Sequence, residues 1–343
     1  MNKKHELGQF FTTNYKYILQ NLKIPDAIKN IIEPFCGNGD LLNFLDKNKY
    51  KIECFDIEPK HDYIVKKDTL QNPPKYLNKF IITNPPFLAR NKAKNKSIFN
   101  KYNVNDLYKC FIKNIISNIA LGGIIIIPLN FWSSIRKQDI ELRKDFLKIY
   151  NIINLNIFEE KVFNDTSYTI CSFQFELKKH NENNELNITI YPSKIKIKTE
   201  LNDNNNFIIG GEIYNLKSDN KYTITRLTKK NKSLHNTNIL VKCIDDNLNN
   251  LVNLSFVSDD NIYIDTTPKS SARTYASLII EPKLTIEKQK KLIKQFNNYL
   301  SKHRKKYNSL FLTNYRESKD IARKRISFDL VYQIIGYLLN KLD

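Results

Sequence analysis

The sequence predicts an α/β fold in which helices cover a mostly parallel sheet of seven strands. From residue 28 to residue 177, short apolar runs alternate with segments of helical pattern, which is typical of such a sheet. Hydrophobic residues make up 41% and aromatic residues 12% of the chain, enough for a folded core. After Leu177 the sequence changes to "KKHNENNELN" and "TELNDNNNFIIGG", Asn-rich stretches with little to bury. We therefore expect two domains, residues 1–180 and residues 181–343.

The same patterns predict the individual elements. Strands are predicted over residues 28–35, 50–57, 63–68, 79–84, 122–129, 152–158 and 168–177. Helices are predicted after Gly39, over residues 104–120, where apolar residues recur about every 3.6 positions, and over residues 136–150. Asn105 or Asp106 would cap the second helix. The C-terminal part has short strand-like pieces, a long basic helical segment and a final amphipathic helix, which predicts an α+β domain.

The composition indicates a polyanionic partner. A formal charge of +20 exceeds what solubility requires and favours nucleic acid, with an anionic membrane surface as the alternative. A genome rich in A and T, which favours Lys and Asn codons, is the other explanation of this excess. The five cysteines are dispersed, without a paired spacing or a nearby His cluster, so neither disulfides nor a metal site are predicted.

The start of the chain, "MNKKHELGQFF", lacks the apolar core of a signal peptide. The longest apolar runs are far shorter than the roughly 18 residues of a membrane span. We therefore expect a monomer without a membrane partner in a reducing compartment. This would be the cytoplasm, or the cytoplasm or nucleus of a host cell if the protein is viral.

The segment "IIEPFCGNGDLL" (31–42) runs from a strand into a glycine turn and then into helix-forming residues. Gly37 and Gly39 let the backbone approach a ligand, and the helix start offers free N–H groups. An acidic residue, Glu33, stands before the turn, which argues against a phosphate and for a cationic amino group. The alternative is a plain turn between a strand and a helix.

Acidic residues follow the next two strands. Asp56 in "ECFDIEPK" comes about twenty residues after the glycines, where an acid binds the two hydroxyls of a ribose. Glu58 is the rival for this role. Asp68 would accept a hydrogen bond from an adenine amino group, and a helix cap is the alternative for it.

The segment "IITNPPFLARN" (81–91) breaks a buried strand at a point where open sheets bind ligands. Asn84 offers a side-chain carbonyl, and Pro85 offers a backbone carbonyl without a competing N–H. Two such acceptors would hold the hydrogens of an exocyclic amino group and direct its lone pair outward. Phe87 supplies a flat face for a nucleobase.

In order along the chain, these segments resemble the motifs of S-adenosylmethionine-dependent DNA adenine N6-methyltransferases, in the group whose target-recognition domain is C-terminal. "GQFFTT" (8–13) resembles the N-terminal motif, "EPFCGNG" the methionine-binding loop and "FDIEP" the ribose acid with its adenine-contacting neighbour. "KD" (67–68) resembles the adenine-amine contact, and "NPPF" (84–87) the catalytic motif. The five motifs cover about residues 8–90, and the sheet pattern extends the resemblance to residue 177.

The resemblance implies a Rossmann-like class I methyltransferase fold and a site-specific DNA adenine methyltransferase (EC 2.1.1.72 type) of a restriction-modification system. S-adenosyl-L-methionine would be the cofactor and duplex DNA the substrate. A flipped adenine would attack the sulfonium methyl directly through N6, without a metal. The implied catalytic residues are Asn84, Pro85, Pro86 and Phe87. The implied cofactor-binding residues are Thr12, Glu33, Pro34, Phe35, Gly37, Gly39, Asp56, Ile57, Asp68 and Asn84.

The sequence departs from the family's pattern at two places. Thr69 stands where relatives often have an aromatic residue that stacks on the cofactor's adenine. The second aromatic residue that stacks on the flipped base is expected within "KVFNDTSYT" (161–169), as Phe163, with Tyr168 as the runner-up. Other interpretations are the same chemistry on RNA, methylation of a protein glutamine, and a DNA-binding module without activity. A cognate restriction endonuclease is not visible in one chain.

The segment from residue 282 to residue 325 carries ten Lys and four Arg against three acidic residues, with aromatic residues interleaved. A solvated helix face would mix its signs, so a DNA contact is predicted. The expected DNA-binding residues are Lys305, Lys306, Arg316, Arg323, Lys324 and Arg325. Residues 308–325 also resemble the end of the recognition domain in relatives that modify short palindromes such as CATG. The loop at residues 267–275 is a second candidate contact.

Overall fold

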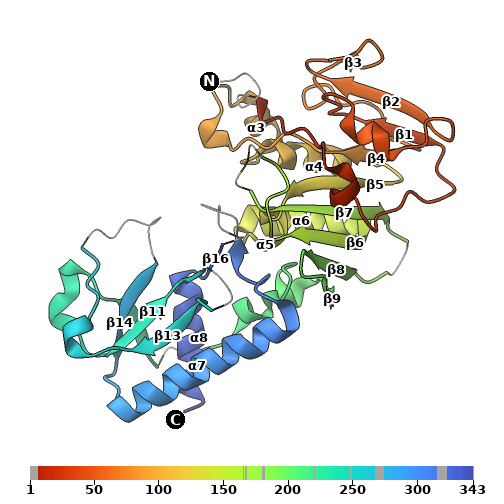
Figure 1. Ribbon diagram of the computed structural model, residues 1–343. Helices are drawn as coiled ribbons and strands as arrows, with labels where there is room; N and C mark the ends of the chain where they lie inside the picture. The colour runs from red at the N-terminus through yellow and green to blue at the C-terminus, as the bar shows by residue number, and fades with distance from the viewer. Residues whose placement is uncertain are drawn as a thin grey trace. The chain divides into compact units, whose positions relative to one another are not determined.

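The computed structural model describes residues 7–164, 166, 168–179, 182–219, 221–246, 249–266, 274–314 and 323–342. These residues form two compact units, which meet in the sequence between Asn202 and Asp203 (Figure 1). The limit at residue 180 that the Asn-rich texture predicts falls inside the first unit. Two further strands, β8 (Glu185–Tyr191) and β9 (Ile195–Glu200), continue the sheet beyond it.

The first unit is built on one sheet with the strand order β3-β2-β1-β4-β5-β7-β6-β8-β9. The seven predicted strands are present as β1 (Asn30–Glu33), β2 (Lys51–Asp56), β3 (Val65–Lys66), β4 (Phe80–Thr83), β5 (Gly122–Pro128), β6 (Tyr150–Phe158) and β7 (Ile170–Leu177). Strands β1 to β5 pair in parallel, whereas β7 runs antiparallel to both β5 and β6. The predicted α/β fold, with a mostly parallel sheet followed by a C-terminal α+β domain, is confirmed.

The strand order reverses direction between β1 and β4, which lie side by side at the centre of the parallel part of the sheet. All four residues of β4 are buried, as expected for an apolar strand covered on both faces. Ligands of open α/β sheets bind at the carboxyl ends of the strands at such a reversal. Asn84 follows the last residue of β4 and therefore stands at this point.

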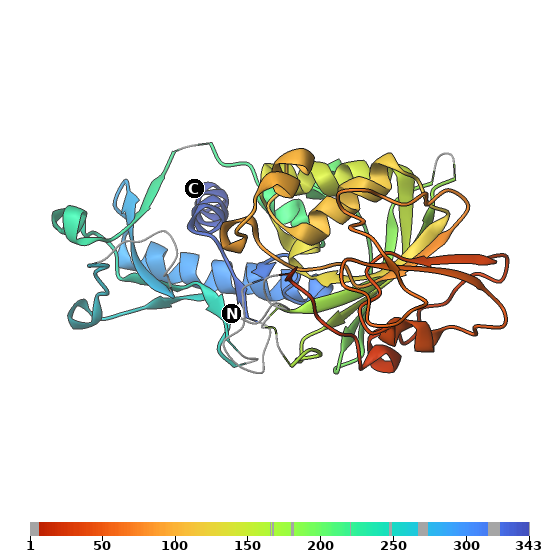
Figure 2. The same cartoon turned by 90° about the horizontal axis from the view of Figure 1, so that it is seen from above.

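Helices cover the two faces of the sheet. In Figure 2, α4 (Leu107–Ser117) and α6 (Lys137–Ile149) lie on one side, and α2 (Tyr15–Ile18) with the 3-10 helix η1 (Asp40–Phe44) lies on the other. Alternate residues of β7 contact the two layers, because Phe175 packs on Phe146 of α6, with ring centroids 5.4 Å apart, whereas Ser172 donates to the carbonyl of Ile18. The helix predicted after Gly39 is a 3-10 helix of five residues, η1. Shorter helices are η2 (Arg90–Lys92), α3 (Ser97–Tyr102) and α5 (Asn130–Ser133).

The second unit is an α+β domain. Its four-stranded antiparallel sheet has the order β10 (Thr223–Arg226), β14 (Tyr275–Glu281), β11 (Ile239–Lys242), β13 (Asn253–Phe256). The predicted basic helix is α7 (Ile286–Tyr307), which packs against β13, and the predicted final helix is α8 (Phe328–Asn340), which packs against α7 and β10. A small sheet joins β12 (Ile244–Asp245), β16 (Lys324–Arg325) and β15 (Thr313–Asn314). The described residues of this unit also form the 3-10 helices η3 (Asp203–Asn205), η4 (Gly211–Asn215), η5 (Lys229–Leu234) and η6 (Asp259–Asn261).

Within the described part of the chain, no helix is both long enough and apolar enough to cross a membrane.

Candidate active site

The turn after β1 has the backbone conformation that its glycines predict. Gly37 and Gly39 have φ angles of 53° and 79°, in the left-handed region that L side chains rarely adopt. A Cβ atom at Gly39 would also lie 2.6 Å from the hydroxyl of Tyr63. Pro34 is buried and Phe35 is half-buried within the same turn. The chain therefore passes the carboxyl end of β1 without side chains at its two tightest points.

Glu33, the last residue of β1, is a buried acid at the carboxyl edge of the sheet. It is 1% exposed, and its Oε1 accepts hydrogen bonds from the Thr83 hydroxyl (2.5 Å) and the Phe35 amide (3.0 Å). Its Oε2 is buried and has no hydrogen-bond partner among the described residues. Burial raises the pKa of the Glu33 carboxyl well above its usual range, although the two hydrogen bonds oppose this. Once the carboxyl is ionised, its free oxygen is an acceptor available to a donor on a ligand.

Asp56, the last residue of β2, is buried beside the glycine turn. Its Oδ2 accepts from the Gly37 amide (2.8 Å) and its Oδ1 from the Glu58 amide (2.7 Å), so the carboxylate also braces the turn. Carboxylate oxygens have spare lone pairs, which leaves room for a further donor such as a hydroxyl. The neighbouring Ile57 is 40% exposed and free to cover a ring. Glu58 is only half-buried.

Asp68 shows the contacts of a turn residue. Its Oδ1 accepts from the amides of Leu70 and Gln71, at 3.1 and 3.0 Å, and a turn follows it instead of the helix that the capping alternative requires. The hydroxyl of Thr69 donates to the Pro34 carbonyl at 2.9 Å, so Thr69 ties this loop to the glycine turn. The adenine contact of Asp68 therefore stays a prediction.

Asn84 is the centre of the site. Its Nδ2 donates to the Phe10 carbonyl (2.7 Å) and the Thr12 hydroxyl (3.0 Å), and the carbonyl fixes the orientation of the amide because it can only accept. Its Oδ1 is buried and has no partner in the described structure. Thr12, 3% exposed, therefore helps to hold the Asn84 amide in this structure. The amide presents one oriented, unsatisfied acceptor at the end of β4.

Aromatic rings surround the candidate catalytic motif at residues 84–87. Phe87, which is 3% exposed, stacks on Phe10 with ring centroids 5.4 Å apart and an angle of 24°. Phe163, 5% exposed, lies 6.4 Å from the same Phe10 ring, whereas the Tyr168 ring is 6.5 Å from Phe87 at 86°. Both proposed base-stacking residues, Phe87 and Phe163, therefore contact Phe10, which the motif "GQFFTT" contains but which the sequence did not single out. A flat side chain two positions before Thr12 was the available signal.

The backbone also fixes the turn that carries this candidate motif. The Phe87 amide donates to the Gly8 carbonyl at 2.9 Å, and a Cβ at Gly8 would lie 2.8 Å from the Phe87 carbonyl oxygen. Pro85 is buried and Pro86 half-buried. The segment from Gly8 to Thr12 thus lies directly against the turn, a contact that the sequence motifs did not predict.

The expected DNA-binding residues occupy different environments. Lys305 is exposed on α7, and Lys306 is exposed but lies 3.8 Å from Glu212 and over the Tyr307 ring. Lys324 is 5% exposed within β16, and Arg323 Nε lies 3.3 Å from Asp246 Oδ1. Arg325 is half-buried in the same strand, and Arg316 and most of the 267–275 loop are outside the described residues. Lys324 is thus a buried structural lysine here, which corrects its expected position at the surface.

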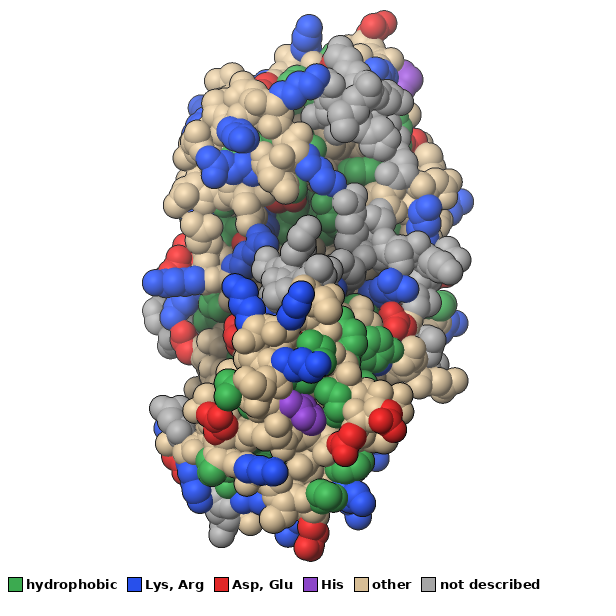
Figure 3. All heavy atoms as spheres, turned by 90° about the vertical axis from the view of Figure 1, so that its left-hand side faces the viewer, with side chains coloured by type: hydrophobic (Ala, Val, Ile, Leu, Met, Phe, Trp, Pro, Cys, Tyr) green, Lys and Arg blue, Asp and Glu red, His purple; other side chains and the backbone are tan. Residues whose placement is uncertain are grey.

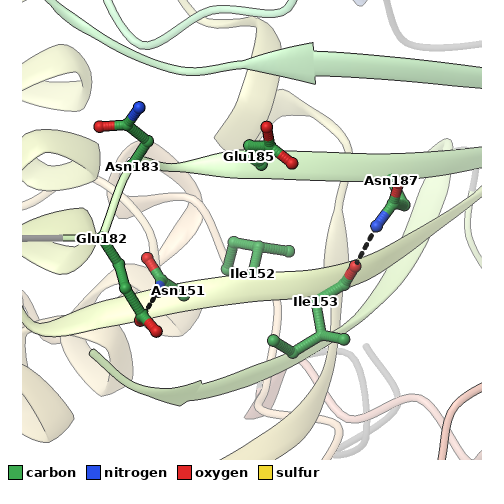
Figure 4. Close-up of a pocket in the computed structure, with 7 residues that line it drawn as sticks. All are labelled: Asn151, Ile152, Ile153, Glu182, Asn183, Glu185 and Asn187. Carbon is green, nitrogen blue, oxygen red and sulfur yellow. Dashed lines mark hydrogen bonds between the residues drawn. The ribbon is translucent and has the colours of Figure 1, made fainter. Parts of the chain in front are cut away.

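A groove at the opposite edge of the sheet is a separate feature (Figure 4). It has a volume of about 420 Å³ and is lined by Asn151, Ile152, Ile153, Glu182, Asn183, Glu185 and Asn187. These residues lie at the amino ends of the parallel strands β6 and β8, whereas Asn84 follows the carboxyl end of β4. Two of its polar groups are already paired, because Asn151 donates to Glu182 and Asn187 to the Ile153 carbonyl. The groove is not part of the candidate active site.

Comparison with known proteins gives structural likenesses only. Neither a protein-family model nor a curated protein sequence matches the chain. The structure of a type I restriction-modification complex has 13% identity and a TM-score of 0.43, over 56% of this chain and 46% of that one. The methyltransferase subunit of the Streptococcus thermophilus type I restriction-modification system has 12% identity and a TM-score of 0.39, over 53% of this chain and 47% of that one. The M protein of the type I restriction enzyme EcoKI has 12% identity and a TM-score of 0.39, over 97% of this chain and 73% of that one.

This chain spans about half the length of the first two of these structures, at 46% and 47%. With identities of 12–13% and TM-scores of 0.39–0.43, these likenesses say nothing of the activity of this chain. Function is therefore inferred from the site residues of this chain.

Proposed function

We propose that the protein transfers a methyl group from S-adenosylmethionine to the N6 amino group of an adenine in DNA. The observation that carries this proposal is the oriented Asn84 amide, whose Oδ1 is buried and without a partner among the described residues. A buried acceptor costs free energy until a donor reaches it. At the end of β4, beside the aromatic rings of Phe10 and Phe87, the fitting donor is an amino group on a flat base.

The carboxyl edge of the sheet fits the proposed cofactor. The free Oε2 of Glu33 suits the ammonium of its methionine part, and the lone pairs of Asp56 suit its ribose hydroxyls. Ile57 would cover the adenine, and Asp68 would accept from its amino group. Pro34, Phe35, Gly37 and Gly39 would line the cofactor between these two contacts. When bound, the cofactor supplies an electrophilic methyl group on a sulfonium.

The residues of the catalytic turn would position and polarise the acceptor. Asn84 Oδ1 and the Pro85 carbonyl accept the two N6 hydrogens, so that the nitrogen lone pair is directed away from the ring plane. Both oxygens stabilise the positive charge that develops on N6 during the attack. Holding the base in this orientation supplies much of the remaining rate, and Pro86 keeps the turn rigid.

The adenine would leave the duplex to reach a turn that is largely buried. Phe87 would stack on the flipped base, with Phe163 or Tyr168 near its other side. In the structure the Phe10 ring already stacks on Phe87. The base therefore has to take the remaining face of Phe87 or displace Phe10.

Methylation of adenine in RNA is the nearest alternative, because the site would grip the same amino group. A protein glutamine amide is a weaker candidate, since a basic C-terminal domain has no role in that reaction. Both alternatives use the same cofactor, so cofactor binding does not separate them.

Tritiated methyl transfer to three substrates in parallel tests the proposal. Unmethylated genomic DNA as duplex, the same DNA as single strands, and total RNA would each be incubated with the protein and labelled S-adenosylmethionine. We expect label in duplex DNA, recovered as N6-methyladenine after digestion. Label in RNA alone would replace the DNA assignment by the RNA one, and no transfer to any nucleic acid would refute the proposed function.

Replacement of Asp56 by Ala should weaken S-adenosylmethionine binding by about 1.5–3 kcal/mol, the usual cost of removing a hydrogen bond to a charged group. The same change removes the two hydrogen bonds that brace the glycine turn. Calorimetry on Asp56→Ala and on the matched Glu58→Ala separates the two candidates for the ribose contact. Weaker binding confined to Glu58→Ala would transfer the role to Glu58.

The exposed lysines of α7 form the best candidate DNA surface in the second unit. Lys291, Lys294, Lys302 and Lys305 are exposed and recur at helical spacing, opposite the buried Leu292, Phe296, Leu300 and Tyr307. Such a row could follow a phosphate backbone. On the face that Figure 3 shows, Lys and Arg side chains are dispersed and Asp and Glu lie among them. Net charge alone does not mark an interface there.

Replacing Lys291, Lys294 and Lys305 together by Gln should weaken binding to all duplexes alike. The slope of log K against log salt should fall by about 0.9 for each phosphate that the helix no longer neutralises. The matched control replaces the exposed Lys47, Lys60 and Lys196 of the first unit, which removes the same net charge. Equal slopes in wild type and the α7 variant would remove this helix from the interface, whereas equal decreases in both variants would indicate a general charge effect.

A further inference from the structure

A second segment of the chain holds the catalytic turn, and it belongs to the start of helix α4. Asp106, 9% exposed, precedes α4, and its Oδ1 accepts a hydrogen bond from the amide of Leu88 at 3.1 Å. Leu88 is the residue directly after the motif Asn84–Phe87. Asp106, one of the two candidate caps that the sequence predicted, is the N-cap residue of α4, but its side chain makes no capping hydrogen bond there.

The backbone strengthens this link. Residues 89 and 106 form an antiparallel bridge. The Leu107 amide donates to the Leu88 carbonyl (3.2 Å), and the Arg90 amide donates to the Asn105 carbonyl (2.9 Å). Three hydrogen bonds thus join the two segments, and only the carboxylate contact depends on a side chain.

We propose that Asp106 is a positioning residue that holds the turn of Asn84 and Phe87 in the geometry for methyl transfer through the Leu88 amide. This inference rests on the proposed function for its effect on catalysis, but the contact itself is present in the structure. The Gly8 carbonyl holds the Phe87 amide from the N-terminal segment, and Asp106 holds the next amide from α4. Successive amides are therefore fixed by two segments far apart in the sequence.

The charge on Asp106 is balanced at a distance rather than by a direct ion pair. Lys109, 5% exposed, donates to Asp139 at 2.6 Å and to Asn105 Oδ1 at 2.8 Å, which joins α4 to α6. Burial raises the pKa of Asp106 to about 7, while the Lys109 ammonium and nearby backbone amides lower it. The other titratable groups of these elements that act on Asp106 or Lys109 are Tyr108, Cys110, Asp139 and Arg136.

The contact is consequently sensitive to pH in the neutral range. Above pH 7 the carboxylate is ionised, and its hydrogen bond from the Leu88 amide is charge-assisted. Below pH 7 the group is protonated, and a weaker neutral hydrogen bond remains. We expect turnover to fall on the acid side with an apparent pKa near 7, because the turn is then held less firmly.

Two variants and a matched control test this inference. Asp106→Asn keeps an acceptor for the Leu88 amide but does not titrate, so kcat at pH 8 should stay within about threefold of wild type and the acid limb near pH 7 should disappear. Asp106→Ala removes the acceptor, and kcat should fall by about 10-fold to 100-fold with a smaller change in KM, because a misplacement of about 1 Å costs about 10² in rate. The control is Asp145→Asn on the surface of α6, which should leave the pH profile unchanged.

Amide hydrogen exchange of peptides covering residues 84–92 provides a readout that does not depend on activity. Protection should be lower in Asp106→Ala than in wild type, and in wild type lower at pH 6 than at pH 8 after correction for intrinsic rates. Asp106→Asn should show no such difference with pH. An unchanged exchange pattern in Asp106→Ala, or an acid limb that persists in Asp106→Asn, would overturn the inference. If no substrate is methylated, the proposed function fails, while the exchange measurement still decides the role of Asp106.

Discussion

Asn84→Ala should bind S-adenosylmethionine with nearly the affinity of wild type, and its methyl transfer should be slower by about 10² or more. The size of the effect follows other active sites, where one preorganised hydrogen-bonding group that meets developing charge contributes about this factor. Here the charge that develops on the methylated nitrogen is positive, and the protein group is a hydrogen-bond acceptor. Both signs are therefore opposite to those of sites where hydrogen-bond donors meet a developing negative charge. Cofactor binding should survive because Glu33 and Asp56 belong to other strands.

The orientation of the amide sharpens this experiment. Asn84→Asp keeps the size of the side chain but replaces the nitrogen that the Phe10 carbonyl and the Thr12 hydroxyl hold. A carboxylate beside a carbonyl oxygen is repelled, so this variant should also be nearly inactive. Asn91→Ala, an exposed asparagine of η2, is the matched control. Near-normal turnover in Asn84→Ala would refute the assignment of the catalytic acceptor.

Glu33→Gln should lower S-adenosylmethionine affinity by about 1.5–3 kcal/mol, because a neutral amide replaces a buried carboxylate that would pair with the ligand's ammonium. In the unliganded protein the same change should be stabilising. The raised pKa of Glu33 means that the folded state holds its proton to higher pH than the unfolded state. Stability therefore falls as pH rises above the unfolded-state pKa, and Gln removes this decrease.

The same carboxyl makes cofactor binding depend on pH. The titratable groups that act on Glu33 or respond to it are Cys36, Cys54, Asp56 and Tyr76, all of which are acids. Glu33 must lose its proton to pair with the ammonium, so affinity should rise with pH, by up to about tenfold per unit, until the free carboxyl is ionised. Calorimetry in buffers of different ionisation enthalpy should show release of up to one proton in wild type. A proton release that persists in Glu33→Gln would place the titrating group elsewhere.

The sheet of the first unit could be predicted from the sequence because its strands are short, apolar and separated by helical or turn residues. All seven appear in their expected places. The strands β8 and β9 were missed because the Asn-rich texture before them indicated a boundary. The pattern of β8 was available, since alternate residues of "ELNITIY" are buried. A short segment with two-residue periodicity next to a polar stretch is easily interpreted as the edge of a domain.

The site residues divide in the same way. Asn84, Glu33 and Asp56 could be placed because each stands at or directly after the end of a predicted strand. Asp106 pointed to a helix cap in the sequence, and only the fold brings the Leu88 amide to it. Lys324 was predicted to contact phosphate because a run of charge carries no information about burial. Its position in β16 depends on pairing with β12, about eighty residues earlier.

The orientation of the Asn84 amide has a consequence for the interpretation of four-residue motifs. An asparagine followed by two prolines can present either its nitrogen or its oxygen to a ligand, and the motif alone does not choose. In this chain the Phe10 carbonyl and the Thr12 hydroxyl, some seventy residues upstream, decide the orientation. Both belong to a segment without regular secondary structure. "NPPF" therefore forms a defined acceptor only together with the partner segment. Without that segment packed against it, the asparagine amide would be free to rotate and would present no fixed acceptor.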